Sequence, residues 1–266
     1  MELRDRVAVV TGGARGIGAA LCRRFAEEGA AAIIIADLDR AAAEELAGQL
    51  GAPATARECD VRSEASIVEL VRATRERHGR IDLFCSNAGI TVSGTEETPD
   101  DDWQRLWDVN VMSHVYAARA VLPSMLERGE GHLLQTSSAA GLLTEIGSAA
   151  YSVTKHGAVA FAEWLSVRYR RRGIRVSCLC PAGVATEFLK EDDAIHQFLA
   201  TSALTPEDVA EAVIQGLADE RFLILPHHQV AEFFAFKGED YDRWLHNFSR
   251  IAQKLDRIAN RREATD

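Results

Sequence analysis

The chain has 266 residues, of which 40 are acidic and 30 are basic, so its formal net charge is −10. A protein that mainly binds nucleic acid needs a basic face to neutralise phosphates, and this balance argues against that class. With 47% hydrophobic residues the chain can bury a substantial core, and its 19 glycines and 6 prolines are too few for a collagen-like or disordered protein.

The N-terminal segment does not resemble a targeting signal. Only four apolar residues, Val7–Val10, precede a glycine-rich stretch, whereas a signal peptide has an apolar core of about 7–15 residues. The longest apolar run, Ala30–Ala36, has seven residues, against the roughly 18 that a membrane span needs. The sequence therefore predicts a cytoplasmic protein that does not enter a membrane.

The five cysteines are scattered and odd in number. Cys178 and Cys180 occupy alternate positions of an apolar run, so both thiols are expected on one face of a strand. We interpret the cysteines as small core residues of a reducing compartment and expect no metal site.

Short apolar runs alternate along the chain with longer amphipathic segments. Bulky or β-branched residues at consecutive positions are typical of strands that are covered on both faces. The predicted strands are Val7–Val10, Ala32–Ala36, Thr55–Cys59, Asp82–Ser86, His132–Thr136, Ile174–Leu179 and Phe222–Leu225. The predicted helices are Gly16–Glu28, Arg40–Leu50, Glu64–His78, Pro99–Leu126, Ser152–Arg172 and Pro206–Leu217.

Two of these helices carry clear start signals. Thr98 and Thr205 are each followed by a proline and then by acidic residues, which predicts a threonine N-cap in both places. Repeated strand–helix–strand units predict an α/β protein with a single doubly wound, Rossmann-type domain over residues 1–228. We expect a parallel sheet of about seven strands with helices on both faces.

Residues 229–266 form a predicted C-terminal helical extension of the same domain. Apolar residues recur at a helical period from Val230 to Ala259, with a break near Gly238. The opposite face carries Lys237, Arg243, Arg250, Lys254, Arg257, Arg261 and Arg262. Such a stripe most often docks on its own body or on a sister subunit; a lid over the substrate and contact with a membrane surface are the alternatives.

A glycine-rich segment, Thr11–Gly18, lies between the first predicted strand and the first predicted helix. Glycines let the chain turn tightly and let its backbone approach a pyrophosphate at the positive end of the helix. The segment lacks the Gly-Lys-Ser/Thr of a nucleoside-triphosphatase loop. The cofactor-binding residues predicted here are Gly12, Arg15, Gly16, Ile17 and Gly18.

Asp37 ends the second predicted strand, 19 residues after Gly18. A carboxylate at this position can accept hydrogen bonds from an adenosine ribose and would repel a 2′-phosphate. The alternative role of Asp37, as a helix N-cap, can be taken by Asp39. Arg15 and Arg40 could attract a 2′-phosphate, but Asp37 would oppose them, so we predict NAD rather than NADP, with Leu38 beside the adenosine.

The glycine-rich segment and several motifs after it resemble the short-chain dehydrogenase/reductase family between about Val7 and Thr186. Thr11–Gly18 is similar to the family's Thr-Gly-x-x-x-Gly-x-Gly cofactor loop, and Tyr151-x-x-x-Lys155 to its catalytic pair. The other matching residues are Asp60-Val61, Asn87-Ala88-Gly89, Asn110 and Ser138.

The resemblance implies further contacts with the dinucleotide. It assigns Asp60 and Val61 to the adenine, and Asn87, Ala88 and Gly89 to the end of a strand beside the cofactor. Pro181, Gly183, Val184 and Thr186 resemble the family's loop at the nicotinamide, although Ala182 replaces the usual glycine. The family's Gly-rich ending is missing, which separates this chain's C-terminus from the family pattern.

Hydride transfer at a carbinol carbon needs a base or acid for the hydroxyl proton. Free tyrosine has a pKa of about 10, and Lys155, four residues after Tyr151 on one helix face, favours the phenolate by its charge. Ser138 is predicted to hold the substrate oxygen against Tyr151, because it lies 13 residues before it, the family's usual spacing. The resemblance implies that Asn110 holds a water molecule, which links Lys155 to solvent.

The predicted substrate-binding residues are Ser138, Leu142, Leu143, Tyr151 and Phe188. An apolar wall with few charges favours a hydrophobic secondary alcohol or ketone, although these residues could equally pack the loop. Glu145 lies nearby, and the sequence assigns it no role.

We therefore predict an NAD-dependent alcohol dehydrogenase that acts on a small molecule. An NADPH-dependent carbonyl reductase and a non-catalytic NAD-binding regulator are the alternatives. The resemblance implies a homodimer or homotetramer built from the helices that begin near Pro99 and Ser152.

Overall fold

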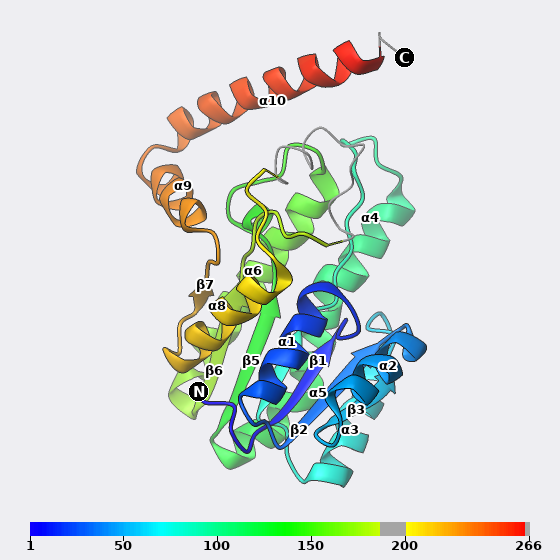
Figure 1. The fold of residues 1–266 in the computed structure, drawn as a ribbon. Coiled ribbons are helices and arrows are strands. Elements are labelled where there is room, and N and C mark those ends of the chain that lie inside the picture. The colour runs from blue at the N-terminus through cyan, green and yellow to red at the C-terminus, as the bar shows by residue number, and fades with distance from the viewer. Residues whose placement is uncertain (187–200, 264–266) are drawn as a thin grey trace.

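The computed structural model describes residues 1–186 and 201–263, which contain one parallel sheet of seven strands in the order β3-β2-β1-β4-β5-β6-β7 (Figure 1). The strands are β1 Val7–Thr11, β2 Ala32–Asp37, β3 Ala54–Glu58, β4 Leu83–Ser86, β5 Gly131–Thr136, β6 Ile174–Leu179 and β7 Leu223–Ile224. The strand order reverses between β1 and β4, as in doubly wound nucleotide-binding folds. The predicted fold class is confirmed.

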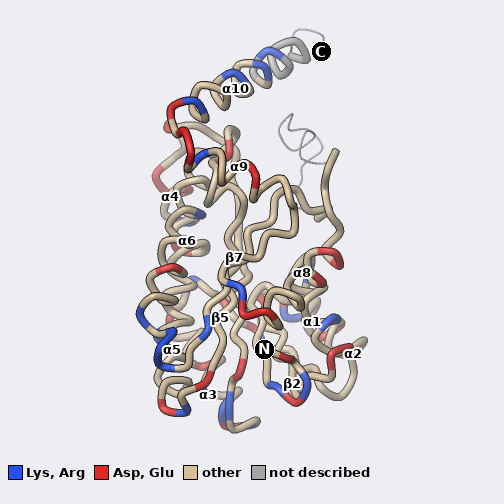
Figure 2. Tube along the Cα trace, turned by 90° about the vertical axis from the view of Figure 1, so that its left-hand side faces the viewer, with Lys and Arg blue, Asp and Glu red and all other residues tan. Residues whose placement is uncertain are grey.

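Helices cover both faces of the sheet. Figure 2 shows α1, α2 and α8 on one side of the strands and α3, α5 and α6 on the other. The helices are α1 Gly16–Glu27, α2 Arg40–Leu50, α3 Glu64–His78, α4 Asp100–Trp107, α5 Ser113–Arg128, α6 Ala149–Tyr169, α8 Pro206–Ala218, α9 His228–Glu239 and α10 Tyr241–Glu263. Helices α9 and α10 stand beyond the carboxyl ends of the strands (Figure 1).

The core lies on both faces of the sheet because successive strand residues point to opposite sides. On β2, Ile33 and Ile35 pack with α1, whereas Ile34 belongs to the cluster that contains residues of α3 and α5. All three are almost fully buried. This two-sided burial explains why the strands have consecutive apolar residues. Cys178 and Cys180 lie together in one core cluster, as predicted, with their Sγ atoms 3.7 Å apart.

Local hydrogen bonds confirm one predicted helix start and correct two others. Thr205 caps α8 through a reciprocal capping box with Asp208, as predicted. Thr98 does not cap α4: its hydroxyl donates instead to the Thr95 carbonyl, and Pro99 is the N-cap. Helix α6 begins three residues earlier than predicted, because Ser148 supplies its capping oxygen.

The predicted helix over 99–126 is interrupted. A π-helical turn, Asp108–Met112, separates α4 from α5. Such turns insert one extra residue into a helix and occur often at functional sites. Its centre holds Asn110, which is fully buried.

The predicted C-terminal extension is helical and breaks at Asp240, two residues after the expected position. In the part of the chain that the structure describes, no helix combines the length and the apolarity that crossing a membrane requires.

Candidate active site

A cavity of about 1040 Å³ opens at the carboxyl ends of the strands, next to the point where the strand order reverses. In doubly wound sheets this position is the usual place for a ligand. The predicted cofactor residues that line it are Gly12, Arg15, Gly16, Ile17, Gly18, Asn87, Ala88, Gly89, Tyr151, Lys155, Pro181, Gly183, Val184 and Thr186. Asp37, Leu38, Asp60 and Val61 lie outside this cavity, and Phe188 lies outside the described residues.

The glycine loop between β1 and α1 has a backbone that only glycine adopts easily. Gly12 and Gly16 have φ angles of 60° and 50°. A Cβ on Gly12 would lie 2.8 Å from the Cα of Ala88, and one on Gly16 would lie 3.2 Å from Cγ2 of Thr186. Arg15, the N-cap of α1, makes no capping bond with its side chain. The loop is therefore a tight cradle with the amides of a helix N-terminus at its base.

Asn87 ties three strand ends together. Its Nδ2 donates to the carbonyls of Thr11 (3.1 Å) and Gly12 (3.2 Å), and its Oδ1 accepts from the Thr136 hydroxyl (3.2 Å). These strand ends belong to β4, β1 and β5. Asn87 therefore fixes the glycine loop against the strand that leads to Ser138.

Asp37 accepts two backbone hydrogen bonds at the end of β2. Its Oδ2 accepts from the Ala14 N–H and its Oδ1 from the Asp39 N–H, each at 3.0 Å. Asp39 caps α2 by accepting from the Ala42 N–H at 3.1 Å. The two aspartates thus divide the roles as the sequence suggested, and Asp37 is held beside the glycine loop.

Both cations near this carboxylate are paired with other acids. Arg15 forms an ion pair with Asp39 at 2.8 Å, and Arg40 forms one with Glu44 at 2.8 Å. The charge of each arginine is therefore already partly balanced by a carboxylate.

The residues predicted around the adenosine, Asp60, Val61 and Leu38, differ in environment, and of these Val61 is the buried apolar side chain. Asp60 is paired with Arg62, whose hydrogen bonds lower the pKa of that carboxyl. Val61 packs in the core, whereas Leu38 is 63% exposed beside Asp37.

Tyr151 and Lys155 lie on one face of α6 and are both buried. Nζ of Lys155 donates to the Thr136 carbonyl at 3.1 Å and lies 5.5 Å from the centre of the Tyr151 ring. Burial lowers the pKa of Lys155 to about 8. Burial disfavours the charged form of either side chain.

Burial also raises the pKa of Tyr151 above that of free tyrosine. A hydrogen bond with the Ser138 side chain lowers that pKa, and the negative charge of Glu145 raises it further. Glu145, which the sequence left without a role, is thus one of the groups that raise the pKa of Tyr151.

The two serines after β5 have different partners. Ser137 donates its hydroxyl to the Lys155 carbonyl at 2.8 Å, which occupies it within the fold. Ser138 accepts from the Ala140 N–H at 3.1 Å and is the serine hydrogen-bonded to Tyr151. The geometry therefore favours Ser138 as the serine at the reacting oxygen.

Asn110 is held on both sides of its amide. Its Oδ1 accepts from the Ile90 N–H and its Nδ2 donates to the Ile90 carbonyl, both at 3.0 Å. Nδ2 also donates to the Thr154 hydroxyl on α6 at 3.1 Å. A Cβ built on Gly89 would lie 3.4 Å from Asn110 Oδ1 and 3.2 Å from Lys155 Nζ. The two side chains therefore lie close to the same side of Gly89.

His227 was missed by the sequence analysis. Its Nδ1 accepts from the Ala182 N–H at 3.2 Å, so Nε2 carries the proton and donates to the Gly183 carbonyl at 3.0 Å. Burial lowers its pKa, which keeps the ring neutral. Its position directly after β7 was the available signal, because every parallel strand ends at this edge. Ala182 itself has no positive φ, so the loop tolerates alanine in place of glycine.

The predicted substrate residues divide into two groups. Leu143 lines the cavity, as does the neighbouring Ile146. The Leu142 side chain is instead packed in the main core and is 3% exposed, so the predicted contact with a substrate is not supported. Thr144 lies in this wall with a φ of 111°, a strained backbone for a β-branched residue.

Lys237 was predicted on the polar face of the tail, but it is buried. Its Nζ donates to the Leu142 carbonyl at 2.6 Å. The ammonium lies 4.8 Å from the centre of the Trp244 ring and 5.3 Å from that of Tyr241. The helical period misplaced it because a carbonyl and two aromatic rings can replace the water around a buried cation.

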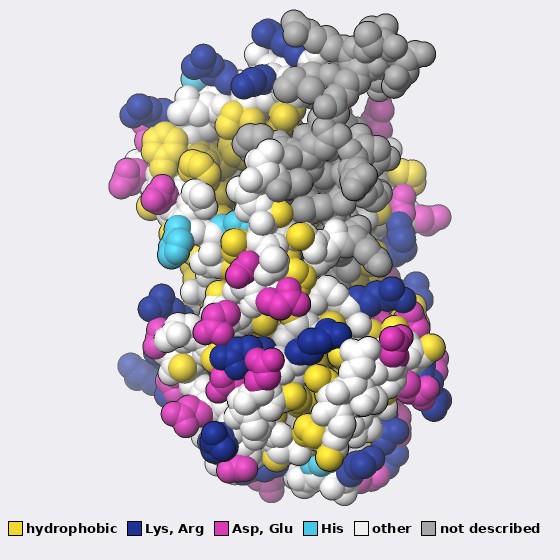
Figure 3. All heavy atoms as spheres, in the orientation of Figure 1, with side chains coloured by type: hydrophobic (Ala, Val, Ile, Leu, Met, Phe, Trp, Pro, Cys, Tyr) yellow, Lys and Arg dark blue, Asp and Glu magenta, His cyan; other side chains and the backbone are white. Residues whose placement is uncertain are grey.

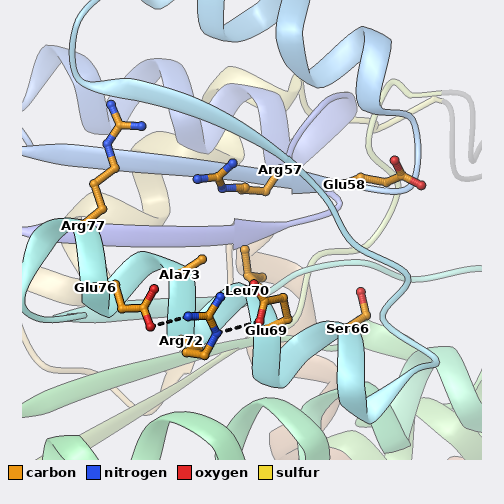
Figure 4. A pocket seen from close by; sticks show the side chains of 9 residues that line it. All are labelled: Arg57, Glu58, Ser66, Glu69, Leu70, Arg72, Ala73, Glu76 and Arg77. Carbon is orange, nitrogen blue, oxygen red and sulfur yellow. Dashed lines mark hydrogen bonds and ion pairs between the residues drawn. The ribbon is translucent and has the colours of Figure 1, made fainter.

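A second cavity, of about 540 Å³, lies between β3 and α3 (Figure 4). Its side chains are mostly charged, and Arg72 is bound by Glu69 and Glu76. Its acids and bases therefore balance one another in large part, and none of the predicted site residues belongs to it.

Comparison with known proteins agrees with this geometry. Residues 6–196 match the family model described as short chain dehydrogenase. A 1-deoxy-11-beta-hydroxypentalenate dehydrogenase from Streptomyces exfoliatus is 35% identical over 92% of this chain and 91% of its own. A momilactone A synthase from Oryza sativa subsp. japonica is 32% identical over 82% of this chain and 85% of its own.

A solved structure is similar over nearly the whole fold. A short chain dehydrogenase/reductase from Burkholderia phymatum, in complex with NAD, superposes with a TM-score of 0.83 at 29% identity. The match covers 91% of this chain and 96% of that one. With the family model, the relatives and the fold in agreement, this chain belongs to the short-chain dehydrogenase family and is an oxidoreductase of that type.

Proposed function

We propose that the protein transfers a hydride between NAD and a hydrophobic secondary alcohol or ketone. The observation that carries this proposal is the meeting of Tyr151, Lys155 and Ser138 in a cavity whose other end is a glycine cradle. The Streptomyces exfoliatus relative is named as a dehydrogenase of a hydroxyl-bearing compound, which fits this reaction class.

The residues present fit a nicotinamide dinucleotide. At Gly12 the chain packs so closely against Ala88 that a Cβ would clash, so the backbone of the loop stays uncovered by side chains there. The amides at the start of α1 favour the binding of a pyrophosphate. Asp37, Leu38, Asp60 and Val61 would hold the adenosine, and Asn87, Ala88 and Gly89 the middle of the dinucleotide. Pro181, Gly183, Val184 and Thr186 would hold the nicotinamide. When bound, the cofactor supplies or accepts the hydride.

Tyr151 moves the proton of the substrate hydroxyl. As phenolate it accepts this proton during alcohol oxidation, and as phenol it returns it during ketone reduction. Ser138, hydrogen-bonded to Tyr151, orients the substrate oxygen. Lys155 stabilises the phenolate by its charge. The ring of Tyr151 and Nζ of Lys155 are close enough, at 5.5 Å, for this effect inside a buried site.

Asn110 supports the exchange of that proton with solvent. Its Oδ1 and the Lys155 ammonium both lie near the position that a Cβ on Gly89 would take. We propose that a water between them links Lys155 to solvent. The π-helical turn fixes the amide for this task by presenting it to Ile90 and Thr154.

The experiment is a panel of secondary alcohols with NAD, followed by the absorbance of NADH. We expect NADH to form with hydrophobic members of the panel. Tight binding of NADH without oxidation of any alcohol, or reduction of any ketone, would favour the non-catalytic regulator instead. Activity with NADPH and ketones in preference to NADH would favour the carbonyl reductase.

We also propose a homo-oligomer formed in part by α6. Ala158 and Leu165 of this helix are core residues, but its Val153, Trp164 and Val167 are 50%, 56% and 86% exposed. Large apolar residues grouped on one helix commonly mark an interface.

The buried free thiols support a reducing compartment, and we propose the cytoplasm.

Sedimentation should therefore give a mass of at least twice 29.1 kDa at micromolar concentration. Trp164→Glu places a charge in the proposed contact and should lower this mass, whereas Val68→Glu, at an exposed position of α3, should not. A wild-type monomer would contradict the proposal.

A further inference from the structure

Helices α9 and α10 supply one wall of the cavity that contains Tyr151 and Lys155. The residues of the two helices that line it are Gln229, Val230, Phe233, Phe236, Trp244, Asn247, Phe248, Ile251 and Leu255. None of these side chains is charged. The tail thus contributes an apolar surface to the same cavity as the catalytic residues.

The apolar cavity-lining residues of α10 follow one face of the helix. Trp244, Phe248, Ile251 and Leu255 are spaced by four, three and four residues, so they lie in one row. The rings of Trp244 and Phe248 are stacked with centres 4.8 Å apart. At 1.5 Å per residue the row is about 16 Å long. This wall is far longer than the carbon chain of a small alcohol.

The opposite side of α10 faces water. Arg243, Arg250 and Lys254 are exposed, and Figure 3 shows Lys and Arg side chains along the outer side of α10, above a group of hydrophobic side chains. This division turns the apolar side inward. Within the row, Trp244 and Leu255 are 5% and 9% exposed, whereas Ile251 is 42% exposed.

Lys237 attaches this wall to the chain segment between Ser138 and Tyr151. Its ammonium bonds to the Leu142 carbonyl, between Ser138 and Tyr151 in sequence, and lies over the ring of Trp244. One buried cation thus connects the chain segment of the catalytic serine and tyrosine to the first turn of α10. A helix held in this way keeps its apolar row over the mouth of the cavity.

We propose that the α9–α10 wall binds the apolar body of the substrate, so that the enzyme selects secondary alcohols and ketones with a large hydrocarbon skeleton. This inference rests on the proposed hydride transfer, because it concerns the same site. Burial of each further methylene contributes about 0.8 kcal/mol, or about fourfold in kcat/KM. Docking of α10 on a second copy of the chain is the competing role and is an outcome of the test.

The test compares 2-butanol, 2-hexanol, 2-octanol and 2-decanol, which share one carbinol group and differ in chain length. With the wild-type protein we expect kcat/KM to rise about fourfold per methylene through the series. Trp244→Ala and Phe248→Ala should each lower the ratio of kcat/KM for 2-decanol to that for 2-butanol by at least tenfold. Leu245→Ala, at a 49% exposed position of the same helix, is the matched control and should leave this ratio unchanged.

Lys237→Met keeps the length of the side chain and removes its charge. We expect it to raise KM for 2-decanol more than KM for 2-butanol, with a smaller effect on kcat, because the wall loses its attachment and the reacting groups stay in place. An equal change for both alcohols would assign Lys237 to general stability.

Tryptophan fluorescence measures ligand binding beside Trp244 and does not require turnover. We expect 2-decanone to quench tryptophan fluorescence in the wild type, and to quench it much less in Trp244→Phe. If no alcohol reacts but 2-decanone still quenches Trp244, the hydride-transfer proposal fails, whereas the proposal that the wall binds an apolar ligand is retained. If alcohols react equally at every length and Trp244 is not quenched, the wall proposal fails alone. Loss of oligomers in Trp244→Ala with an unchanged length series would assign α10 to a subunit contact.

Discussion

Replacing Tyr151 with Phe lowers kcat for alcohol oxidation by about 10²–10⁴-fold, the range of a lost general base. In the proposed reaction the Tyr151 phenolate takes the substrate proton, and Phe fills nearly the same space without the oxygen. Binding of NADH should change little, since the glycine cradle and Asp37 are untouched. Stopped-flow or steady-state kinetics with NAD, together with an NADH titration, measures both quantities. Near-wild-type turnover would remove Tyr151 from the reaction.

Removing the charge of Glu145 should change the pKa of Tyr151 in a known direction. Burial raises the pKa of Tyr151, and the negative charge of Glu145 raises it further. Glu145→Gln removes this charge and lowers the pKa of the phenol. Oxidation needs the phenolate, so the rising limb of the pH–rate profile should move to lower pH. Glu163→Gln, which carries the same charge change at an exposed position of α6, should leave the profile in place. A shift to higher pH would contradict the electrostatic role of Glu145.

The second large effect concerns the choice of cofactor. We expect kcat/KM for NAD to exceed that for NADP by at least 100-fold, because Asp37 would repel a 2′-phosphate. Arg15 and Arg40 offer little compensation, since each is paired with an acid. Hydrogen bonds to a charged group contribute about 1.5–3 kcal/mol each, or roughly tenfold to 100-fold.

Asp37→Asn tests this explanation. The amide oxygen can still accept from the Ala14 N–H, but the negative charge is gone. We expect kcat/KM for NAD to fall by about tenfold or more and that for NADP to rise. Glu45→Gln, with the same charge change on the exposed side of α2, should leave the ratio unchanged. Equal or better use of NADP by the wild type would overturn the assignment of Asp37.

The net charge of −10 makes these local features necessary. The proposed cofactor is an anion, so the field of the whole protein does not attract it. The backbone amides of the glycine cradle, the start of α1 and Arg15 have to supply the attraction at short range. Increasing ionic strength should therefore affect cofactor binding less than it would in a protein with a broad basic surface.

The sequence alone determined the fold class and the order of the site residues along the chain. Consecutive apolar residues such as Ile33–Ile35 predict a strand covered on both faces, and glycines after β1 predict a tight turn before a helix. Both signals are local, because they depend on backbone conformation and side-chain periodicity over a few residues. Thr205 shows the same: its cap partner, Asp208, is three residues away.

Other local signals were ambiguous because a nearby group competed for the same atom. The Thr98 hydroxyl bonds to the Thr95 carbonyl and so cannot cap α4. The π-helical turn at Asn110 interrupts a continuous helical pattern, since the amide is fixed by Ile90, 20 residues earlier, and by Thr154, 44 residues later. Neither partner is visible in the spacing of apolar residues.

Only the tertiary structure decided which groups share the cavity. His227 meets Ala182 and Gly183 across more than 40 residues, and Lys237 meets Leu142 across 95. A helical period places Lys237 on the polar face of the tail, because it counts only neighbours along the helix. The folded chain supplies the carbonyl and rings that stabilise the buried cation. These distant contacts, and not the amphipathic pattern, set the tail over Tyr151.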